Sequence, residues 1–319
     1  MERRAFVVGG VAALAAPLAA EGKVARVGLL GTTFAPPVLM GLTEGLRQRG
    51  WIEGQNLVLE RRFSEGKAER FPALVAELIK LNVDVLVTSG GPAAQAAKDT
   101  TRTVPIVMAA IIDPIGMGLV ASLVRPGGNV TGISWLGVDL TVKRLALLKE
   151  TVPTIARVAV LFNPANPGNA LAAKEMRAAA PGLKLTLHFQ ELRNPDDFEG
   201  ALAGLTGARP DALFTVADPL MYRHRAQILD FAAKRRLPAI YEWKEFVELG
   251  GLMAYGVNLN ELFKRAATFV DKILKGAKPG DLPVEQVTTF ELVLNLRTAK
   301  ALGLTIPQTM LLRADQVIE

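Results

Sequence analysis

The sequence contains no cysteine and only two histidines, His188 and His224. Without cysteine, the chain can form neither disulfide bonds nor metal sites built on thiolates. Two histidines are too few for a histidine-rich metal site, and any Ser-His-Asp catalysis would have to depend on one of them. His188 lies within a predicted strand and His224 in the first turns of a predicted helix, so we interpret both as structural or exposed side chains.

Charge of one sign is nowhere concentrated. The formal net charge is +6, from 37 basic and 31 acidic residues, and the densest basic groups, 234–236 and Arg223 with Arg225, resemble solvated helix faces. A nucleic-acid-binding surface would show a stripe of basic residues with aromatic side chains interleaved. Aromatic residues make up only 6% of the chain, and we therefore predict no nucleic-acid partner.

The common catalytic and nucleotide-binding motifs are also absent, because the sequence has no P-loop, G-x-G-x-x-G, H-E-x-x-H, C-x-x-C or G-x-S-x-G pattern. It does contain VDVLVTSGGPAAQAAKD (83–99), in which an apolar run stops at Thr88-Ser89-Gly90-Gly91-Pro92 and a helical pattern follows. A strand, a tight loop and a helix in this order can hold an anion on exposed backbone N–H groups. Since no P-loop lysine accompanies the loop, the motif does not indicate a nucleotide.

The first twenty residues, MERRAFVVGGVAALAAPLAA, differ from the rest of the chain. Arg3 and Arg4 precede an uncharged run from Ala5 to Ala20 that ends in small residues, which is the layout of an export signal. Arg3-Arg4-x-Phe6 also fits a twin-arginine signal. A membrane anchor and a buried first helix are the alternatives, but the run is shorter than the ~20 apolar residues of a membrane span. We predict export to the periplasm.

From Val24 onward, apolar runs of strand length alternate with stretches of helical periodicity. This alternation predicts βαβ units and parallel sheets. About ten strands are many for one open sheet, and the pattern nearly repeats after about residue 137, so we predict an α/β protein with two similar lobes. Within the pattern we expect a short helix over 116–123 and one long helix over 220–235.

In parallel sheets, ligands bind beyond the carboxyl ends of the strands. Those ends supply hydroxyls, amides, carboxylates and aromatic rings here, which suits a small polar ligand held by hydrogen bonds and ring faces. The candidate ligand-binding residues at these ends are Thr32, Thr33, Phe34, Ser89, Gly90, Asp113, Asn166, Asp218, Tyr241, Glu242 and Tyr255. No cofactor and no metal site are predicted.

Several candidates also have purely structural interpretations. Ser89-Gly90-Gly91 can be a helix cap with a tight turn. Asp113-Pro114 and Asp218-Pro219 can be caps with proline at the first helical position. Tyr241 and Trp243 are more often packing residues than a platform for a ligand.

Several long segments carry a specific resemblance over the whole mature chain, from about Val24 to Glu319. The chain resembles the ABC-transporter substrate-binding proteins of the tryptophan/tyrosine type. The matching segments are GLRQRGWIEGQNLVLERRFSEGK (41–67), VDVLVTSGGPAA (83–94), DPIGMGLVASLVRPGGNVTGIS (113–134), RLPAIYEWKEFVELGGLMAYG (236–256), FVDKILKGAKPGDLPVEQ (269–286) and FELVLNLRTAKALGLTIP (290–307).

The resemblance implies the type I periplasmic-binding-protein fold, in which two doubly wound parallel-sheet lobes are joined by three crossings. It implies a division into an export signal with the start of the mature chain (1–23), an N-terminal lobe (24–137 plus 258–282) and a C-terminal lobe (138–257 plus 283–319). It also implies a monomer that captures a small solute for the membrane permease of an ABC importer, without catalysis.

The resemblance assigns the cleft to loops that the strand-end rule also selects. The 31–34 loop and Ser89-Gly90 would meet the ligand from the first lobe, and Asn166, Asp218 and Glu242 from the second. We expect Ser89 and the Gly90 and Gly91 amides to hold a carboxylate or a similar polar end of the solute. If the solute is an amino acid, Asp218 or Asp113 would bind its ammonium group.

Three other functions remain open at this point. A cleft enzyme could use Asp113 and Asp218 or Glu242 as acid and base, although the catalytic inventory is poor. A transcription regulator would need a helix-turn-helix domain of ~50–60 residues, and only 23 residues precede Val24. A periplasmic sensor subunit cannot be distinguished from a transport protein by the sequence.

Overall fold

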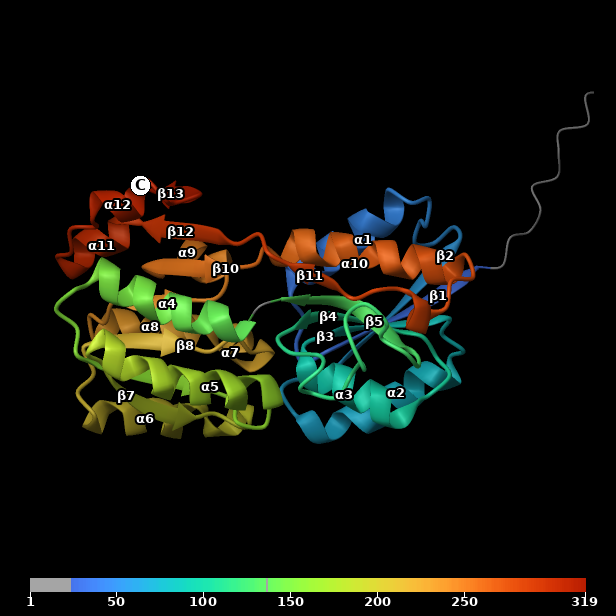
Figure 1. Cartoon of the computed structure of the whole chain (residues 1–319), viewed down its shortest axis with the longest axis horizontal. Helices are drawn as coiled ribbons and strands as arrows, with labels where there is room; N and C mark the ends of the chain where they lie inside the picture. The colour runs from blue at the N-terminus through green and yellow to red at the C-terminus, as the bar shows by residue number, and fades with distance from the viewer. Residues whose placement is uncertain (1–23, 136) are drawn as a thin grey trace, which may run out of the picture.

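The computed structural model describes residues 24–135 and 137–319, which form two lobes lying side by side (Figure 1). The predicted export signal, in residues 1–23, lies outside the described residues. Among the helices of the described ranges, none has the length and apolar composition that a bilayer span requires.

The first lobe contains a sheet of six strands in the order β11-β5-β4-β3-β1-β2, with every described pairing parallel. Its strands are β1 (Ala25–Gly31), β2 (Leu57–Phe63), β3 (Val85–Ser89), β4 (Ile106–Ile111), β5 (Val130–Trp135) and β11 (Glu285–Val287). Its helices are α1 (Pro36–Arg47), α2 (Phe71–Lys80), α3 (Gly91–Thr100) and α10 (Leu259–Leu274). The central strands are mostly apolar because helices cover both faces of the sheet.

In Figure 1, α1 and α10 lie together on one face of the first sheet, and α2 and α3 lie on the other. The α1–α10 contact depends on two glycines one helical turn apart. A Cβ atom at Gly41 would lie 2.1 Å from the Asn260 carbonyl oxygen, and one at Gly45 would lie 2.5 Å from the Lys264 carbonyl oxygen. Glycine therefore lets the two helix backbones approach each other closely. This contact holds α10 against the first lobe, after the chain has returned there from the second lobe.

The second lobe contains a sheet of seven strands in the order β13-β12-β10-β9-β8-β6-β7. Its strands are β6 (Arg157–Phe162), β7 (Thr186–Glu191), β8 (Ala212–Thr215), β9 (Ala239–Tyr241), β10 (Met253–Gly256), β12 (Glu291–Asn295) and β13 (Gln316–Ile318). Its helices are α4 (Gly137–Thr151), α5 (Pro167–Ala179), α6 (Phe198–Gly207), α7 (Pro219–Arg223), α8 (Arg225–Lys234), α9 (Lys244–Glu248), α11 (Leu296–Leu302) and α12 (Gln308–Leu311). β12 runs antiparallel to β10, and the other described pairings are parallel.

The chain passes between the lobes three times, as the resemblance implies. The crossings lie between β5 and α4, between β10 and α10, and between β11 and β12. The boundary that we placed between residues 282 and 283 is wrong, because β11 pairs with β5 and therefore belongs to the first sheet. The third crossing comes later, at 288–290, because a three-residue strand gave too weak a pattern to be recognised.

Two expected helices also differ. Residues 116–123 form turns rather than a helix, with Gly118 in the left-handed region (φ 67°) and the Gly116 amide donating to Asp113 Oδ1 at 2.8 Å. The long helix expected over 220–235 is divided into α7 and α8 at His224, whose backbone (φ −92°, ψ 13°) leaves the helical region. Helical periodicity continues across this break, so the pattern alone could not show it.

Candidate functional site

A pocket lies between the lobes, at the carboxyl ends of strands from both sheets. Among the described residues that line it, Asp218 carries the one formal charge, and none is lysine, arginine or histidine. The first lobe contributes Thr33, Ala35, Val38, Ser89, Gly90, Gly91, Ala110, Ile112, Met117, Trp135 and Leu259. The second lobe contributes Asn166, Ala217, Asp218, Pro219, Tyr222 and Trp243.

The two lobes touch each other around this pocket. A Cβ atom at Gly90 would lie 2.9 Å from Pro219 Cγ, and one at Gly91 would lie 3.1 Å from Asn166 Oδ1. Further out, a Cβ atom at Gly66 would lie 2.4 Å from Pro195 Cγ. Three glycines of the first lobe therefore lie in close contact with side chains of the second lobe. The two lobes are closed over the pocket in this structure.

Asp218 is the centre of a buried hydrogen-bond network in the second lobe. It caps α7 by accepting a hydrogen bond from the Leu220 amide at 2.8 Å. Its Oδ2 accepts from the side-chain amides of Asn166 at 2.9 Å and Asn169 at 3.2 Å, while the Asn163 amide lies 3.4 Å from both carboxylate oxygens. The carboxylate is 2% exposed, and four donors fix its position at the pocket wall.

Burial raises the pKa of Asp218, while its hydrogen bonds from Asn166, Leu220, Asn163 and Asn169 lower it. The net direction is upward because desolvation of the carboxylate outweighs these neutral donors. A cationic group of a ligand would supply the attraction that the neutral donors do not. The site is therefore electrostatically suited to a positive group.

The loop between β3 and α3 approaches the pocket from the first lobe. Ser89 and Gly90 line the pocket, and Gly90 adopts φ 90°, a conformation that favours glycine. The expected use of the Gly90 amide is wrong in this structure, since that N–H donates to the Ala109 carbonyl at 3.1 Å. The Gly91 amide is in the first turn of α3, where N–H groups have no intrahelical acceptor, and with the Ser89 hydroxyl it forms the polar end of the pocket.

Ala110 contributes to the pocket from an irregularity in β4. The pairing of β4 with β5 shifts register between Met108 and Ile111, and Ala110 between them has φ 60°. A bulge of this kind bends the strand and redirects the chain. Here it turns the end of β4 so that Ala110 and Ile112 both line the pocket.

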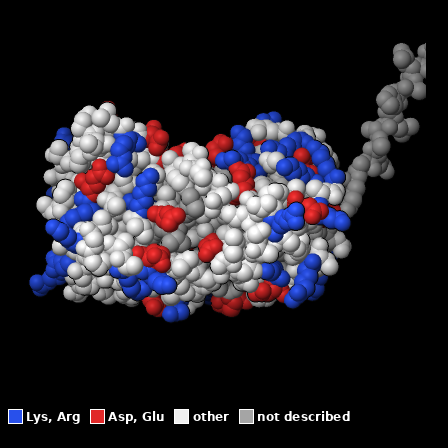
Figure 2. All heavy atoms as spheres, in the orientation of Figure 1, with Lys and Arg blue, Asp and Glu red and all other residues white. Residues whose placement is uncertain are grey.

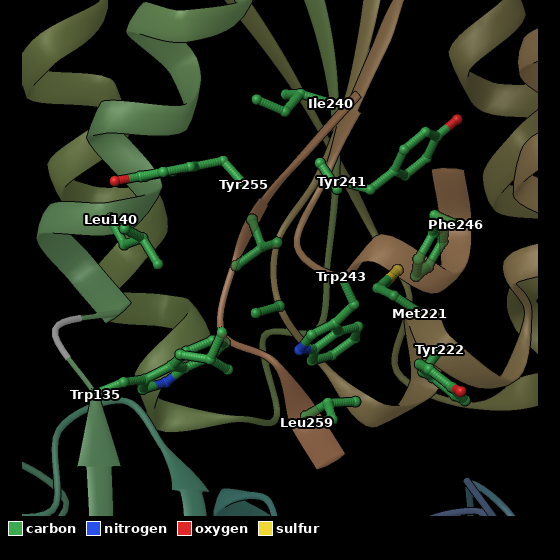
Figure 3. Close-up of a cluster of buried hydrophobic side chains, with 14 of the residues drawn as sticks. Trp135, Leu140, Met221, Tyr222, Ile240, Tyr241, Trp243, Phe246, Tyr255 and Leu259 are labelled. Atoms are coloured by element: carbon green, nitrogen blue, oxygen red, sulfur yellow. The ribbon is translucent and has the colours of Figure 1, made fainter. Parts of the chain in front are cut away.

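Aromatic rings form much of the remaining wall. Trp135, Tyr222 and Trp243 line the pocket, and Figure 3 shows Trp243 beside Leu259, with Trp135 further to the left. Tyr222 and Trp243 pack edge to face with ring centroids 5.6 Å apart. Trp135 is the last residue of β5, but the end of this strand was not among those from which the candidate residues were selected.

Five of the eleven expected ligand-binding residues line the pocket: Thr33, Ser89, Gly90, Asn166 and Asp218. Thr32, Phe34 and Asp113 are not among its lining residues. Thr32 is buried beside the pocket loop, and Phe34 is 49% exposed with its ring edge-on to Phe63. Asp113 stabilises the turn at Gly116 and lines a separate acidic groove with Asp139 and Glu175.

Tyr241, Glu242 and Tyr255 also lie outside the pocket lining. Tyr241 is buried in the core and stacks on Phe246 at 4.7 Å, as the packing interpretation expects (Figure 3). The Tyr255 hydroxyl accepts a hydrogen bond from Lys143 Nζ at 2.6 Å, which joins β10 to α4. Successive side chains of a strand point to opposite faces of the sheet. The position of a residue at the end of a strand therefore does not show whether its side chain points toward the pocket.

Glu242 lies at the end of β9 in a fully buried polar cluster. Its Oε2 accepts from the Thr215 hydroxyl at 2.7 Å and lies 3.7 Å from an Arg144 Nη1. Burial raises the pKa of Glu242 to about 7, against the opposing effects of Arg144 and Thr215. Burial also lowers the pKa of Arg144 to about 10, although Glu242 opposes that shift. The cluster is part of the buried interior of the second lobe and does not line the pocket.

The described residues contain no group of three or more histidine, aspartate or glutamate side chains that could hold a metal ion. On the face shown in Figure 2, basic and acidic side chains are interspersed over both lobes. This distribution provides no continuous basic surface on that face.

Comparison with known proteins agrees with this architecture. A family model described as ABC transporter substrate binding protein matches residues 37–318. A protein of Clostridioides difficile named tyrosine-binding protein is 26% identical over 265 residues, which cover 83% of this chain and 76% of that protein.

Two solved structures are also similar over most of the chain. A conserved domain protein from Vibrio cholerae is 29% identical with a TM-score of 0.86, over 92% of this chain and 100% of that one. An ABC domain from Streptococcus pneumonia in complex with L-Trp is 28% identical with a TM-score of 0.85, over 92% and 99% of the two chains. The two parallel-sheet lobes have the type I periplasmic-binding-protein fold.

Proposed function

Since the chain belongs to the family of ABC transporter substrate-binding proteins, we propose that it captures an amino acid with an aromatic or similarly large apolar side chain. Capture of a small solute outside the cytoplasm, with a membrane permease as partner, follows from membership of the family. The amino-acid class of the ligand is inferred from the pocket.

The observation that carries the proposal is the single carboxylate in a pocket whose described lining has no basic side chain. A ligand with a net negative charge would be repelled by Asp218 and would find no counter-charge. A zwitterion can bind through both of its charged groups. Its ammonium group pairs with Asp218, and its carboxylate accepts hydrogen bonds from uncharged donors of the pocket. The apolar and aromatic wall then contacts the side chain.

The geometry of the loops supports a position for each end of the ligand. The α-carboxylate lies at the Ser89 hydroxyl and the Gly91 amide, at the N-terminus of α3, where the helix dipole favours negative charge. The α-ammonium group lies at Asp218 in the second lobe. Asp218 is close to this carboxylate site, because Asn166, which donates to Asp218, also faces Gly91. Each end is thus held by a different lobe, and binding favours closure.

The relatives support an aromatic side chain. One is named for tyrosine binding, and one similar structure holds L-Trp. In this chain, Trp135, Tyr222 and Trp243 supply ring faces and edges to the same pocket. Aromatic ligands pack well against such rings.

Release of an unchanged ligand, with no catalysis, is part of the proposal. Asp113 and Asp218, the pair that an enzyme could use, line different pockets. We further infer a monomer that is exported through its twin-arginine sequence, Arg3-Arg4-x-Phe6.

Thermal shift with a panel of amino acids and small carboxylates tests the ligand class, because a ligand that binds only the folded state raises the melting temperature. We expect aromatic amino acids to raise it for the parent, and Asp218→Asn and Ser89→Ala to reduce the shift. Asp113→Asn is the matched control, since Asp113 lines another groove. Full binding by an Asp218→Asn, Ser89→Ala double variant would remove this assignment.

A further inference from the structure

Two tryptophan side chains bring unused hydrogen-bond donors to the pocket. Trp135 is 2% exposed and Trp243 is 5% exposed, and both line the pocket. Within residues 24–135 and 137–319, neither indole Nε1 has a hydrogen-bond partner. The third tryptophan, Trp51, differs because its Nε1 donates to Asp271 Oδ1 at 2.9 Å, away from the pocket. The unused donors are therefore a feature of the pocket and not of tryptophan in this chain generally.

A buried donor without an acceptor destabilises the folded state, since most buried polar groups in proteins are hydrogen-bonded. An indole N–H can only donate, so an oxygen of the ligand can supply the acceptor that the protein does not. The two donors also come from different lobes: Trp135 ends β5 of the first sheet, and Trp243 follows β9 of the second. An acceptor that reaches both would add a second link between the lobes when they close.

The position of the indoles within the pocket indicates which acceptor they meet. The polar end of the pocket lies where Gly90 and Gly91 approach Pro219 and Asn166. The indoles line the same pocket as Leu259, the first residue of α10, and Figure 3 shows the nitrogen-bearing edge of Trp243 on the side facing Trp135. The aromatic ring of Tyr222 packs against Trp243 there. This part of the pocket wall is apolar except for the indole N–H groups and the Tyr222 hydroxyl.

We propose that the Nε1–H groups of Trp135 and Trp243 donate to an acceptor on the ligand's side chain. The site then selects an amino acid whose large apolar side chain carries a hydrogen-bond-accepting oxygen. This inference rests on the proposed function, because it takes the α-carboxylate to be held by Ser89 and Gly91 and the α-ammonium by Asp218. The ammonium group has no acceptor to offer, so the side chain is the remaining source.

Matched pairs of ligands isolate the side-chain acceptor. L-tyrosine and L-phenylalanine form one pair, and L-methionine sulfoxide and L-methionine form another; the members of each pair differ by one oxygen. Isothermal titration calorimetry measures the four affinities for the parent. We expect the oxygen-bearing member of at least one pair to bind on the order of tenfold or more tightly, because a site with buried donors rejects an analogue that leaves them unpaired.

Three variants assign that preference to residues. Trp135→Phe and Trp243→Phe keep an aromatic ring and remove the donor. Each should lower the affinity for the oxygen-bearing ligand more than the affinity for its partner, which loses only ring contact. Trp51→Phe is the control and should retain the parent's preference, since its donor serves Asp271.

The other outcomes contradict the proposal in distinguishable ways. Equal losses for both members of a pair would place the indoles on the carboxylate instead. If a variant keeps the parent's preference for the oxygen-bearing ligand, the substituted tryptophan does not donate to that oxygen. If the parent binds both members of each pair equally, or binds only amino acids outside these pairs, the indole assignment alone fails. If no amino acid binds, the amino-acid assignment fails with it.

Discussion

Arg223 of α7 forms an ion pair with Glu65, which follows β2, and so joins the second lobe to the first. Both side chains are partly exposed, at 33% and 47%. Beside them, Gly66 lies against Pro195, also across the two lobes. The ion pair can form only when the lobes meet, so its free energy contributes to closure and not to the stability of either lobe alone.

Neutralising this pair should weaken ligand binding without destabilising the lobes. Exposed ion pairs contribute little, on the order of 0.2–1 kcal/mol, so Glu65→Gln or Arg223→Gln should lower affinity about two- to fivefold. The loss should shrink at high salt, because exposed charges are screened. Calorimetric titration of the single and double variants measures this coupling.

Arg313→Gln provides the control, since Arg313 pairs with Glu150 within the second lobe at 2.9 Å and at similar exposure. That variant should bind ligand as the parent does. Additive losses from Glu65→Gln and Arg223→Gln, with no coupling between them, would show that the pair does not assist closure.

Gly90→Ala should impair closure. A methyl group there would lie 2.9 Å from Pro219 Cγ. The backbone of Gly90, at φ 90° and ψ 161°, is also unfavourable for alanine, at a cost of about 1–3 kcal/mol. We expect a loss of affinity of on the order of tenfold or more. Gly54→Ala separates the two effects, because Gly54 has φ 83° with no atom within 4 Å of the added methyl group. If both variants lose stability and neither loses affinity, the Gly90–Pro219 contact does not matter for binding.

Titration of Glu242 should lower the stability of the protein as the pH rises from about 5 to 8, while His224, whose pKa burial lowers, acts in the opposite direction. The pKa of Glu242 is about 7 in the folded protein, above its ordinary value of 4.5, because burial disfavours the charged form. The folded state therefore binds this proton more tightly, and the stabilisation is complete below about pH 4.5 and lost as the pH rises through 7. The loss is up to about 3 kcal/mol. Burial also raises the pKa of Asp218, which adds to the loss in the same direction.

Urea denaturation at several pH values measures this dependence. Glu242→Gln should reduce the slope between pH 5 and 8, since glutamine stays neutral. Asp211→Asn is the control, because Arg157 lowers the pKa of Asp211 to about 2 and its titration lies below this range. An unaltered slope in Glu242→Gln would mean that Glu242 does not titrate in this range.

Much of the fold could be predicted from the sequence because parallel strands buried on both faces are continuous apolar runs. The apolar run that starts at Val83 contains β3 (Val85–Ser89), and the helical pattern that follows it forms α3 (Gly91–Thr100). Patterning could not show β11, which is three residues long, nor the break at His224, where periodicity continues. The family resemblance supplied what local patterns could not, namely the three crossings.

The site was harder to predict than the fold. The strand-end rule found Ser89, Asn166 and Asp218 because loops at those ends face the other lobe. It also selected Tyr241 and Glu242, whose side chains turn into the second lobe. The rule gives the position of a residue along the chain, whereas the direction of its side chain depends on pairing register and on packing across the two lobes.

The most direct test is mass spectrometry of the compound that gently purified protein releases on denaturation. The account predicts a free amino acid with intact α-ammonium and α-carboxylate groups and a large, largely apolar side chain, released chemically unchanged. A retained compound without an amine, such as a simple carboxylate or a sugar, or a compound altered by incubation with the protein, would contradict it.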